Sequence, residues 1–229
     1  ATDDNGDGIP DKYQVAVTFK VENGSWNDET AEDITVYVTL FDENGDYAET
    51  GSGNLTEVQI PAVGDKPAAG YKAGDWDTTP ATTTEIKEEK TYTYTYVIDN
   101  EQTYTVTYTA EANGSVSPES QKDHVLSNTA ITGSVATANA GYAFDGWYKG
   151  ETLLGTVVDG ATLSEELARA NLNKNETLYA ATEYTAKFAK DDNGDGIPDK
   201  YQVAVTFEVV NGSWNDETTE EIRRASCRE

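Results

Sequence analysis

The sequence repeats itself at an interval of 188 residues, and this constrains its fold more than any other feature. Residues 3–34 align with residues 191–222 without a gap and differ from them at only four places, positions 20, 22, 31 and 33 of the first copy. The other 28 of the 32 aligned residues are identical. Self-similarity at a fixed period is typical of repeat architectures. We therefore expect one complete repeat followed by the start of the next, as a piece of a longer array that lacks its natural start.

The identity ends at Ile222. The first copy continues with an alternating segment at residues 35–40, whereas the second continues as Arg-Arg-Ala-Ser-Cys-Arg-Glu. These seven residues hold three of the four arginines in the chain and its only cysteine, Cys227. Our hypothesis is that residues 223–229 are not native, and we assign Cys227 no chemical role.

The composition is strongly acidic, with 42 Asp and Glu against 16 Lys and Arg and a net charge of −26. Such a surface disfavours nucleic acid and anionic membranes as partners and suits divalent cations, although a halophilic origin would produce the same excess. No apolar run approaches the roughly 20 residues that span a bilayer, so we expect no membrane segment in this part of the protein. One cysteine excludes a disulfide framework, and with abundant Thr and Tyr it favours an exported bacterial β-protein.

Alternating apolar residues predict strands at four places: residues 13–20, 34–40, 92–96 and 104–108. A shared Gly-Tyr-x4-Trp spacing at Gly70 and Gly141, and a shared Asn-Gly-Ser turn at Asn23 and Asn113, divide the repeat into two related modules. In the second module, a capping box from Thr162 to Glu165 predicts one short helix with Leu163, Leu167 and Ala170 on one face. The expected organisation is a linker loop at 1–12, modules at 13–99 and 103–189, and the start of the next repeat at 190–222.

Two segments of the second module carry a family resemblance. Gly-Tyr-Ala-Phe-Asp-Gly-Trp-Tyr at 141–148, followed by Glu-Thr-Leu-Tyr-Ala at 176–180, resembles the internalin-type B-repeats of bacterial surface proteins. The first module, with its Asn-Gly-Ser-Trp opening and Thr-Tyr closing strand, is similar to repeats of mucin-binding-type surface proteins. These resemblances imply an α+β, mainly β fold of two β-grasp-like modules in tandem, in a wall-attached protein with a spacing or adhesive role. The helical insertion at 162–172 departs from the simplest B-repeat.

The acidic linker places oxygen-bearing side chains at alternate positions, as an EF-hand loop does, with a glycine at the sixth position for the sharp turn. Through Gly8-Ile9-Pro10-Asp11 the loop also resembles the calcium loops of thrombospondin type 3 and dockerin-like repeats. Gln14 occupies the twelfth position, where a bidentate carboxylate is usual, so we expect weak binding of Ca²⁺, with a Kd of about 10⁻⁴–10⁻³ M. The alternative is an acidic turn that needs no metal. The expected ligands are Asp3, Asn5, Asp7, Ile9 and Asp11 in the first copy, and Asp191, Asn193, Asp195, Ile197 and Asp199 in the second.

Other residues give weaker signals. Trp26 is placed either in the core, which we favour, or on the surface as a platform for a sugar ring. His124 is the only histidine, and no nucleophile elbow, histidine cluster or phosphate-cradling glycine loop accompanies it. We therefore expect no catalytic residue, no enzyme activity and no organic cofactor.

These observations together predict a non-catalytic repeat of a secreted or wall-anchored bacterial surface protein, in which calcium stiffens the joints between repeats. A host or cell-wall glycan or protein would bind elsewhere in the full protein. Two alternatives stay open: the modules bind a glycan themselves through exposed aromatic side chains, or they belong to an accessory region of a large extracellular hydrolase.

Overall fold

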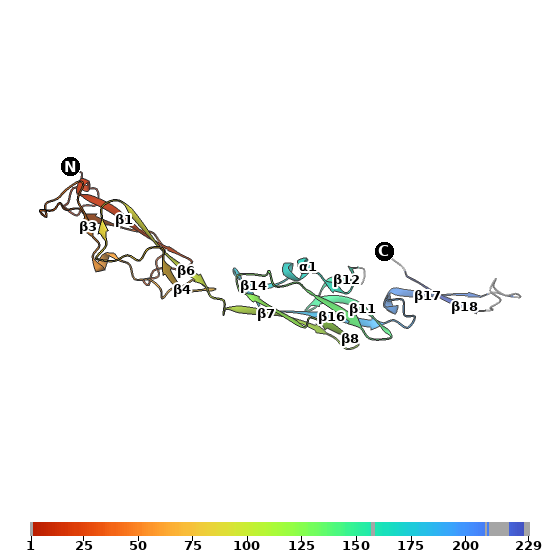
Figure 1. Cartoon of the computed structure of the whole chain (residues 1–229). Helices are drawn as coiled ribbons and strands as arrows, with labels where there is room; N and C mark the ends of the chain where they lie inside the picture. The colour runs from red at the N-terminus through yellow and green to blue at the C-terminus, as the bar shows by residue number, and fades with distance from the viewer. Residues whose placement is uncertain (1, 157–158, 209, 211–219, 227–229) are drawn as a thin grey trace. The chain divides into compact units, whose positions relative to one another are not determined.

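The computed structural model describes residues 2–156, 159–208, 210 and 220–226. Within these residues the chain is mainly β with one short α-helix, in agreement with the sequence. It divides into two compact units, residues 1–101 and residues 102–229, and each unit has a hydrophobic core of its own. Figure 1 follows the strands of both units along the chain.

The first unit is built on a four-stranded sheet with the order β2-β1-β6-β4. The first and last strands, β1 and β6, are parallel neighbours in the centre, and β2 and β4 pair antiparallel at the edges. Residues 2–101 contain no α-helix. The elements are the 3-10 turn η1 (Asp11–Tyr13), β1 (Gln14–Glu22), β2 (Ile34–Thr39), β3 (Gly53–Asn54), the 3-10 turn η2 (Glu57–Gln59), β4 (Tyr71–Trp76), β5 (Glu85–Ile86) and β6 (Lys90–Ile98).

Period-two alternation accounts for the core of this unit. In β6, Tyr92, Tyr94 and Tyr96 are buried while the threonines between them are less so, because successive side chains of a strand point to opposite faces. Val17 and Phe19 of β1 are fully buried on the neighbouring strand. The alternation in the sequence therefore predicted these strands correctly.

The second unit has a five-stranded sheet with the order β12-β11-β16-β7-β9 and a three-stranded sheet with the order β13-β10-β8. Its elements are β7 (Thr103–Ala110), β8 (Gly114–Ser117), β9 (Ser120–His124), β10 (Ser134–Ala138), β11 (Tyr142–Lys149), β12 (Thr152–Thr156), β13 (Thr162–Leu163), α1 (Glu165–Ala170), β14 (Asn173–Asn175), β15 (Leu178–Ala180), β16 (Thr182–Lys190), the 3-10 turn η4 (Asp199–Tyr201), β17 (Gln202–Glu208) and β18 (Glu220–Ser226).

Three strands of each unit follow one plan. The first strand lies parallel to the last (β1 to β6, β7 to β16), and the Gly-Tyr-x4-Trp strand pairs antiparallel with that last strand (β4 to β6, β11 to β16). Both of these antiparallel ladders contain a register shift at the same point of the motif. In the shared Asn-Gly-Ser turns, Asn23 and Asn113 both have positive φ angles, of 60° and 81°. The two units are thus built alike where their sequences are alike.

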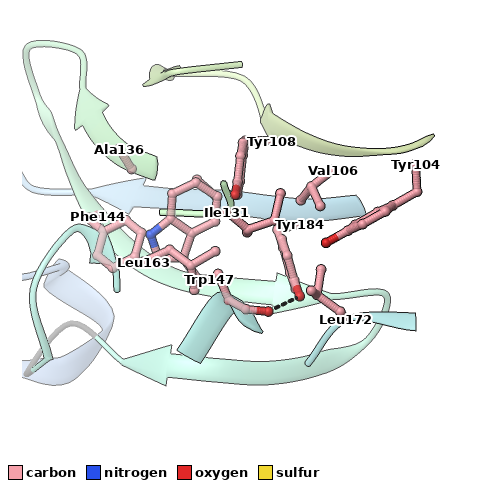
Figure 2. Close-up of a cluster of buried hydrophobic side chains, with 12 residues drawn as sticks. Tyr104, Val106, Tyr108, Ile131, Ala136, Phe144, Trp147, Leu163, Leu172 and Tyr184 are labelled. Atoms are coloured by element: carbon pink, nitrogen blue, oxygen red, sulfur yellow. Dashed lines mark hydrogen bonds between the residues drawn. The ribbon is translucent and has the colours of Figure 1, made fainter. Parts of the chain in front are cut away.

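The core of the second unit is formed by side chains of the large sheet, of β10 and β13, and of helix α1 (Figure 2). Trp147 is 1% exposed, and its indole N–H donates to the carbonyl of Ala161 at 3.0 Å. The hydroxyl of Tyr184 on β16 donates to the carbonyl of Ala168 in the helix at 2.7 Å, the contact drawn as a dashed line in Figure 2. This bond ties the helix to the central strand of the sheet.

The helix begins two residues later than the capping box predicted. Ser164 is the N-cap, and its hydroxyl accepts a hydrogen bond from the backbone N–H of Leu167. Thr162 and Leu163 instead form strand β13, because they pair with Val135 and Ser134 of β10. Ala168 is the buried helical residue and Ala170 is exposed, so the expected face of Leu163, Leu167 and Ala170 was wrong.

The second copy of the repeat start pairs its strands one residue out of step with the first. In the first copy Phe19 lies opposite Ile34, whereas Phe207 lies opposite Glu221, the equivalent of Asp33. A one-residue slip exchanges the two faces of a strand. The hypothesis that 223–229 are not native stays a prediction; residues 223–226 lie in β18, and Cys227 is outside the described residues.

Within the described part of the chain, no helix has both the length and the apolar character needed to cross a membrane.

Candidate functional site

The candidate site is the acidic linker that precedes the first strand of each repeat copy. In the first copy it runs from residue 3 through turn η1 into β1, and in the second it runs from the end of β16 through η4 into β17. Pro10 and Pro198 precede the two turns with almost the same backbone angles, φ −58° and ψ 133° against φ −53° and ψ 133°. The linker thus has the same turn geometry in both copies.

Asp3 organises the first half of the loop. One of its carboxylate oxygens accepts the backbone N–H of Gly6 at 2.8 Å and the other accepts that of Gly8 at 2.9 Å. Both glycines have positive φ angles, 72° and 86°, which residues with a side chain adopt at a cost. These angles allow the backbone to curl around the carboxylate.

The next two expected ligands act in the same way. The side-chain oxygen of Asn5 accepts the N–H of Asp7 at 3.0 Å, and Asp7 accepts the N–H of Ile9 at 2.8 Å. The amide of Gln14 donates to Asp7 at 2.6 Å and accepts from Asn5 at 3.0 Å. The hydrogen bond from Gln14, followed by that from the backbone of Ile9, lowers the pKa of Asp7, because both favour the charged form.

The last expected side-chain ligand of the first copy, Asp11, closes the loop. The carboxylate of Asp11 accepts the N–H of Asp4 at 3.1 Å, and its own N–H donates to the carbonyl of Thr2 at 3.0 Å. The second copy repeats this pattern. Asp191 accepts from Gly194 and Gly196, Asn193 from Asp195, Asp195 from Ile197, and Asp199 from Asp192.

The acidic side chains of the linker therefore lie along one curved stretch of backbone, and they accept hydrogen bonds from the backbone N–H groups of the same loop. In the described residues, no group of three or more His, Cys, Asp or Glu side chains is arranged so that it could hold a metal ion. A cation in this loop would thus use amide and backbone oxygens beside the carboxylates. Ca²⁺ accepts all three kinds of ligand.

No role for Asp145 was predicted from the sequence, yet it is the acidic residue that fixes the second linker to the folded unit. Asp145 is the extra residue in the β-bulge of β11, between Phe144 and Gly146, and it is 7% exposed. Its carboxylate accepts Lys200 Nζ at 2.6 and 2.7 Å and the hydroxyl of Tyr201 at 2.9 Å. Bulges often re-aim a side chain in this manner.

At this contact the pKa values of Lys200 and Tyr201 are both raised. Partial burial lowers the pKa of Lys200, but the hydrogen bonds to Asp145 and Tyr201 outweigh burial and raise it overall. Burial, followed by the hydrogen bond to Asp145, raises the pKa of Tyr201. Close by, the N–H of Asp191 donates to the carbonyl of Gly141 at 3.1 Å, and Asp191 is 5% exposed. The linker is thus fixed to the second unit at both of its ends.

The equivalent residues of the first copy contact the unit that follows them. Lys12 Nζ lies 2.8 Å from Glu49, and this hydrogen bond raises the pKa of Lys12. The ring of Tyr13 stacks on Tyr47, with centroids 5.8 Å apart and an interplanar angle of 22°. Tyr47 also packs against Phe41, with centroids 5.5 Å apart.

The remaining sequence candidates have structural roles in the protein. Trp26 is 1% exposed and its indole N–H donates to the carbonyl of Glu32 at 2.9 Å, so it belongs to the core, as favoured. His124 accepts the N–H of Leu126 through Nδ1. Asp123 beside it accepts hydrogen bonds from loop groups, including the N–H of Ala130. The hydrogen bonds of His124 and Asp123 stabilise the turn that follows β9.

Comparison with known proteins finds one part of the chain similar to a repeat family. Residues 104–181, which lie within the second unit, match the sequence model of the Listeria-Bacteroides repeat domain. This repeat is typical of bacterial surface proteins. A search of curated proteins found no match. The match ends before the linker at 191–201, and Asp145 lies inside the matched residues.

Proposed function

We propose that the chain is a non-catalytic spacer region of a secreted or wall-anchored bacterial surface protein. Its repeats present successive β units, and the acidic linker controls how one repeat joins the next. The observation that carries this proposal is the fixation of the second linker to the end of its unit, through Asp191 and through Lys200 with Tyr201. A flexible Gly-rich linker would have no such contacts.

The shared strand plan supports one module type repeated along the chain. Central parallel first and last strands, flanked by antiparallel neighbours, are the arrangement expected of a β-grasp-like module. The two units would then be versions of this module, the second with helix α1 packed over its sheet. The similarity of residues 104–181 to a bacterial surface repeat supports the extracellular location.

Calcium at the linker is part of the proposal. Three features support it: oxygen-bearing side chains at alternate positions, glycines with positive φ at the turn, and the same hydrogen-bond pattern in both copies. The excess of negative charge in the loop also favours a divalent cation. Binding would require Gln14, whose amide now donates to Asp7, to turn its oxygen toward the ion or to withdraw.

The test is small-angle scattering of a tandem protein in which residues 3–189 follow residue 190, so that a complete second repeat is present. We expect a larger maximum dimension with calcium than with a chelator, because the ion would hold the linker extended. The matched control carries Asp3→Ala and Asp191→Ala at the two linkers and should not respond to calcium. Identical profiles with and without calcium in the parent protein would contradict the stiffening role.

Glycan binding by the modules is a second candidate, because the first unit exposes aromatic side chains. Tyr47 is 52% exposed and Phe41 is 41% exposed, and with Tyr13 they form a contiguous aromatic cluster. Large amphipathic rings of this kind are common in binding surfaces. Binding on a glycan array that is lost in Tyr47→Ala, with the unfolding midpoint unchanged, would support this candidate over the spacer role.

A further inference from the structure

The two linker copies display two different halves of one set of contacts. The first copy has a following unit in the chain, and its Lys12 and Tyr13 contact Glu49 and Tyr47 of that unit. The second copy has a preceding unit, and its Lys200 and Tyr201 contact Asp145 there. Each copy lacks, within this sequence, the partner that the other copy shows.

The contacts of the first copy and those of the second copy use different parts of the equivalent lysine and tyrosine side chains. Tyr13 uses its ring face against Tyr47, whereas Tyr201 uses its hydroxyl toward Asp145, and Tyr201 remains 45% exposed. A lysine ammonium has three N–H donors, so it can serve two carboxylates at once. The lysine side chains at Lys12 and Lys200 are 47% and 49% exposed, which leaves room for a second partner.

The local geometry of the lysine and tyrosine is also the same in both copies. Lys12 Nζ lies 4.4 Å from the centroid of the Tyr13 ring, and Lys200 Nζ lies 4.9 Å from that of Tyr201. The residues after the turns, Gln14 and Gln202, have similar extended backbone angles. One Lys–Tyr pair can therefore make both the contacts to the preceding unit and the contacts to the following unit without a change in the backbone of its turn.

We infer that, between complete repeats, the Lys–Tyr pair of the linker is a two-sided connector that binds the preceding and the following unit at the same time. On one side Asp145 accepts the lysine ammonium and the tyrosine hydroxyl. On the other side the counterpart of Glu49 accepts the ammonium, and the counterpart of Tyr47 stacks on the tyrosine ring. The partner of the Asp145 surface is thus the next copy of this repeat.

The sequence restricts this connector to one of the two junctions in a repeat. In the Gly-Tyr-x4-Trp alignment, the position of Asp145 is Gly74 in the first unit. The segment between the units, residues 99–102, contains neither lysine nor tyrosine. The contact surface at the end of the second unit is therefore specific for the start of a new repeat.

This inference rests on the proposed spacer role in that complete repeats must follow one another, but it needs no bound ion. The tandem protein described above, in which residues 3–189 follow residue 190, contains the whole junction and no cysteine. Spin labels at Thr137→Cys in the first repeat and Glu88→Cys in the second, both at exposed positions, report the distance across the junction. The width of the distance distribution measures how firmly the junction is held.

We expect a narrow distribution in the parent protein. Asp145→Asn in the first repeat should broaden it, and so should Tyr47→Ala with Glu49→Gln in the second. Lys66→Ala is the matched control, because it removes an exposed ion pair, to Glu29, and Lys66 bonds to Ser25, beyond the end of β1 that is opposite to Tyr13. Thermal unfolding of each variant shows whether the units remain folded.

Two outcomes would overturn the connector. The parent distribution could be as broad as that of the variants, or it could broaden with Asp145→Asn while the changes at Tyr47 and Glu49 have no effect. Recording each protein with calcium and with a chelator separates this inference from the proposed calcium role. Broadening by Asp145→Asn in both conditions, with no effect of the chelator on the parent, supports the connector and contradicts the calcium role. If the chelator broadens the distance distribution of the parent and Asp145→Asn does not, the result supports the calcium role and contradicts the connector.

Discussion

Asp145 and Lys200 form an ion pair across 55 residues of sequence, with Nζ 2.6 Å from the nearer carboxylate oxygen and the aspartate side chain 8% exposed. The aspartate lies in the bulge of β11 and the lysine in turn η4, beyond the end of β16. An ionised carboxylate with so little exposure needs a hydrogen-bonded partner. The pair therefore fixes the start of one repeat to the unit before it.

Removal of Lys200 should loosen the linker. In Lys200→Ala, Asp145 keeps only the hydroxyl of Tyr201, and such a loss costs about 1–3 kcal/mol. The amide of Asp191, which donates to Gly141 in the same contact region, should then exchange its hydrogen faster. Hydrogen exchange at this amide is the measurement, with Lys87→Ala as control. Unchanged protection in Lys200→Ala would show that the ion pair does not hold the linker.

Alkaline pH should release the same contact. The folded-state pKa of Tyr201 and that of Lys200 both lie above their usual values of 10.0 and 10.5. A group with a raised pKa stabilises the fold below its unfolded pKa, and this contribution is lost as the pH rises through the folded pKa. The linker contact should therefore be constant from neutral pH to about pH 10 and be lost above it.

Titration of the tyrosine ring carbons by NMR checks this expectation. The pKa of Tyr201 should fall toward 10.0 in Asp145→Asn, because the charged acceptor is gone. Tyr108, whose pKa burial raises to about 12, is an internal reference that should not respond. The same Tyr201 titration in the parent and in Asp145→Asn would contradict the assigned contact.

Much of the fold followed from local patterns in the sequence. Alternation predicted the strands that carry Val17, Tyr92 and Tyr108, because burial on one face of a sheet imposes a period of two. The helix start was missed because Thr162 has Glu165 three residues later and so matches a capping box, whereas the actual N-cap, Ser164, has Leu167 at that position. The pairing of Leu163 with Ser134 places Thr162 in a strand instead. That pairing is a tertiary contact, which local pattern does not contain.

The linker contact was missed for a similar reason. Its signal is an aspartate within the otherwise apolar run Tyr-Ala-Phe-Asp-Gly-Trp-Tyr, where a buried charge requires a partner. The partner lies 55 residues away in sequence, and only the bulge at Asp145 directs the side chain toward it. The repeated Lys-Tyr dipeptide at Lys12 and Lys200 was visible in the sequence, but both roles of the pair depend on the folded units.

Glycine is required where the Asn-Gly-Ser turns meet the last strand of each unit. A Cβ at Gly24 would overlap the ring of Tyr96 and lie 2.6 Å from the carbonyl oxygen of Lys66, and one at Gly114 would overlap the ring of Phe188. Overpacking of this kind costs about 1–3 kcal/mol. Gly24→Ala should cost more than Gly114→Ala, because a backbone atom cannot move aside as a ring can.

Denaturant unfolding monitored separately for each unit by NMR measures these effects. Gly155→Ala is the control, since its Cβ would meet Leu167 at an ordinary 3.5 Å. An equal and negligible effect of all three substitutions would show that the turns tolerate a side chain and that the shared geometry is incidental.

Substitution of Gln14 and Gln202 tests whether the linker is a calcium loop or a turn that binds no metal. They occupy the position at which an EF-hand loop uses a bidentate glutamate. If calcium binds, Gln14→Glu with Gln202→Glu should strengthen binding at least about tenfold, toward the range of sensor loops. If it does not, each new carboxylate would only repel Asp7 or Asp195, to which the glutamine amides donate. Calcium-dependent thermal unfolding of this variant measures the difference, and lower stability without any response to calcium would favour the bare turn.

Calorimetric titration of the chain with calcium tests the account most directly. We predict uptake of two ions per chain at millimolar calcium, one at each linker, and its loss when Asp3→Ala is combined with Asp191→Ala. The absence of uptake at millimolar calcium in the folded parent chain would contradict the claim that an ion stiffens the joints between repeats.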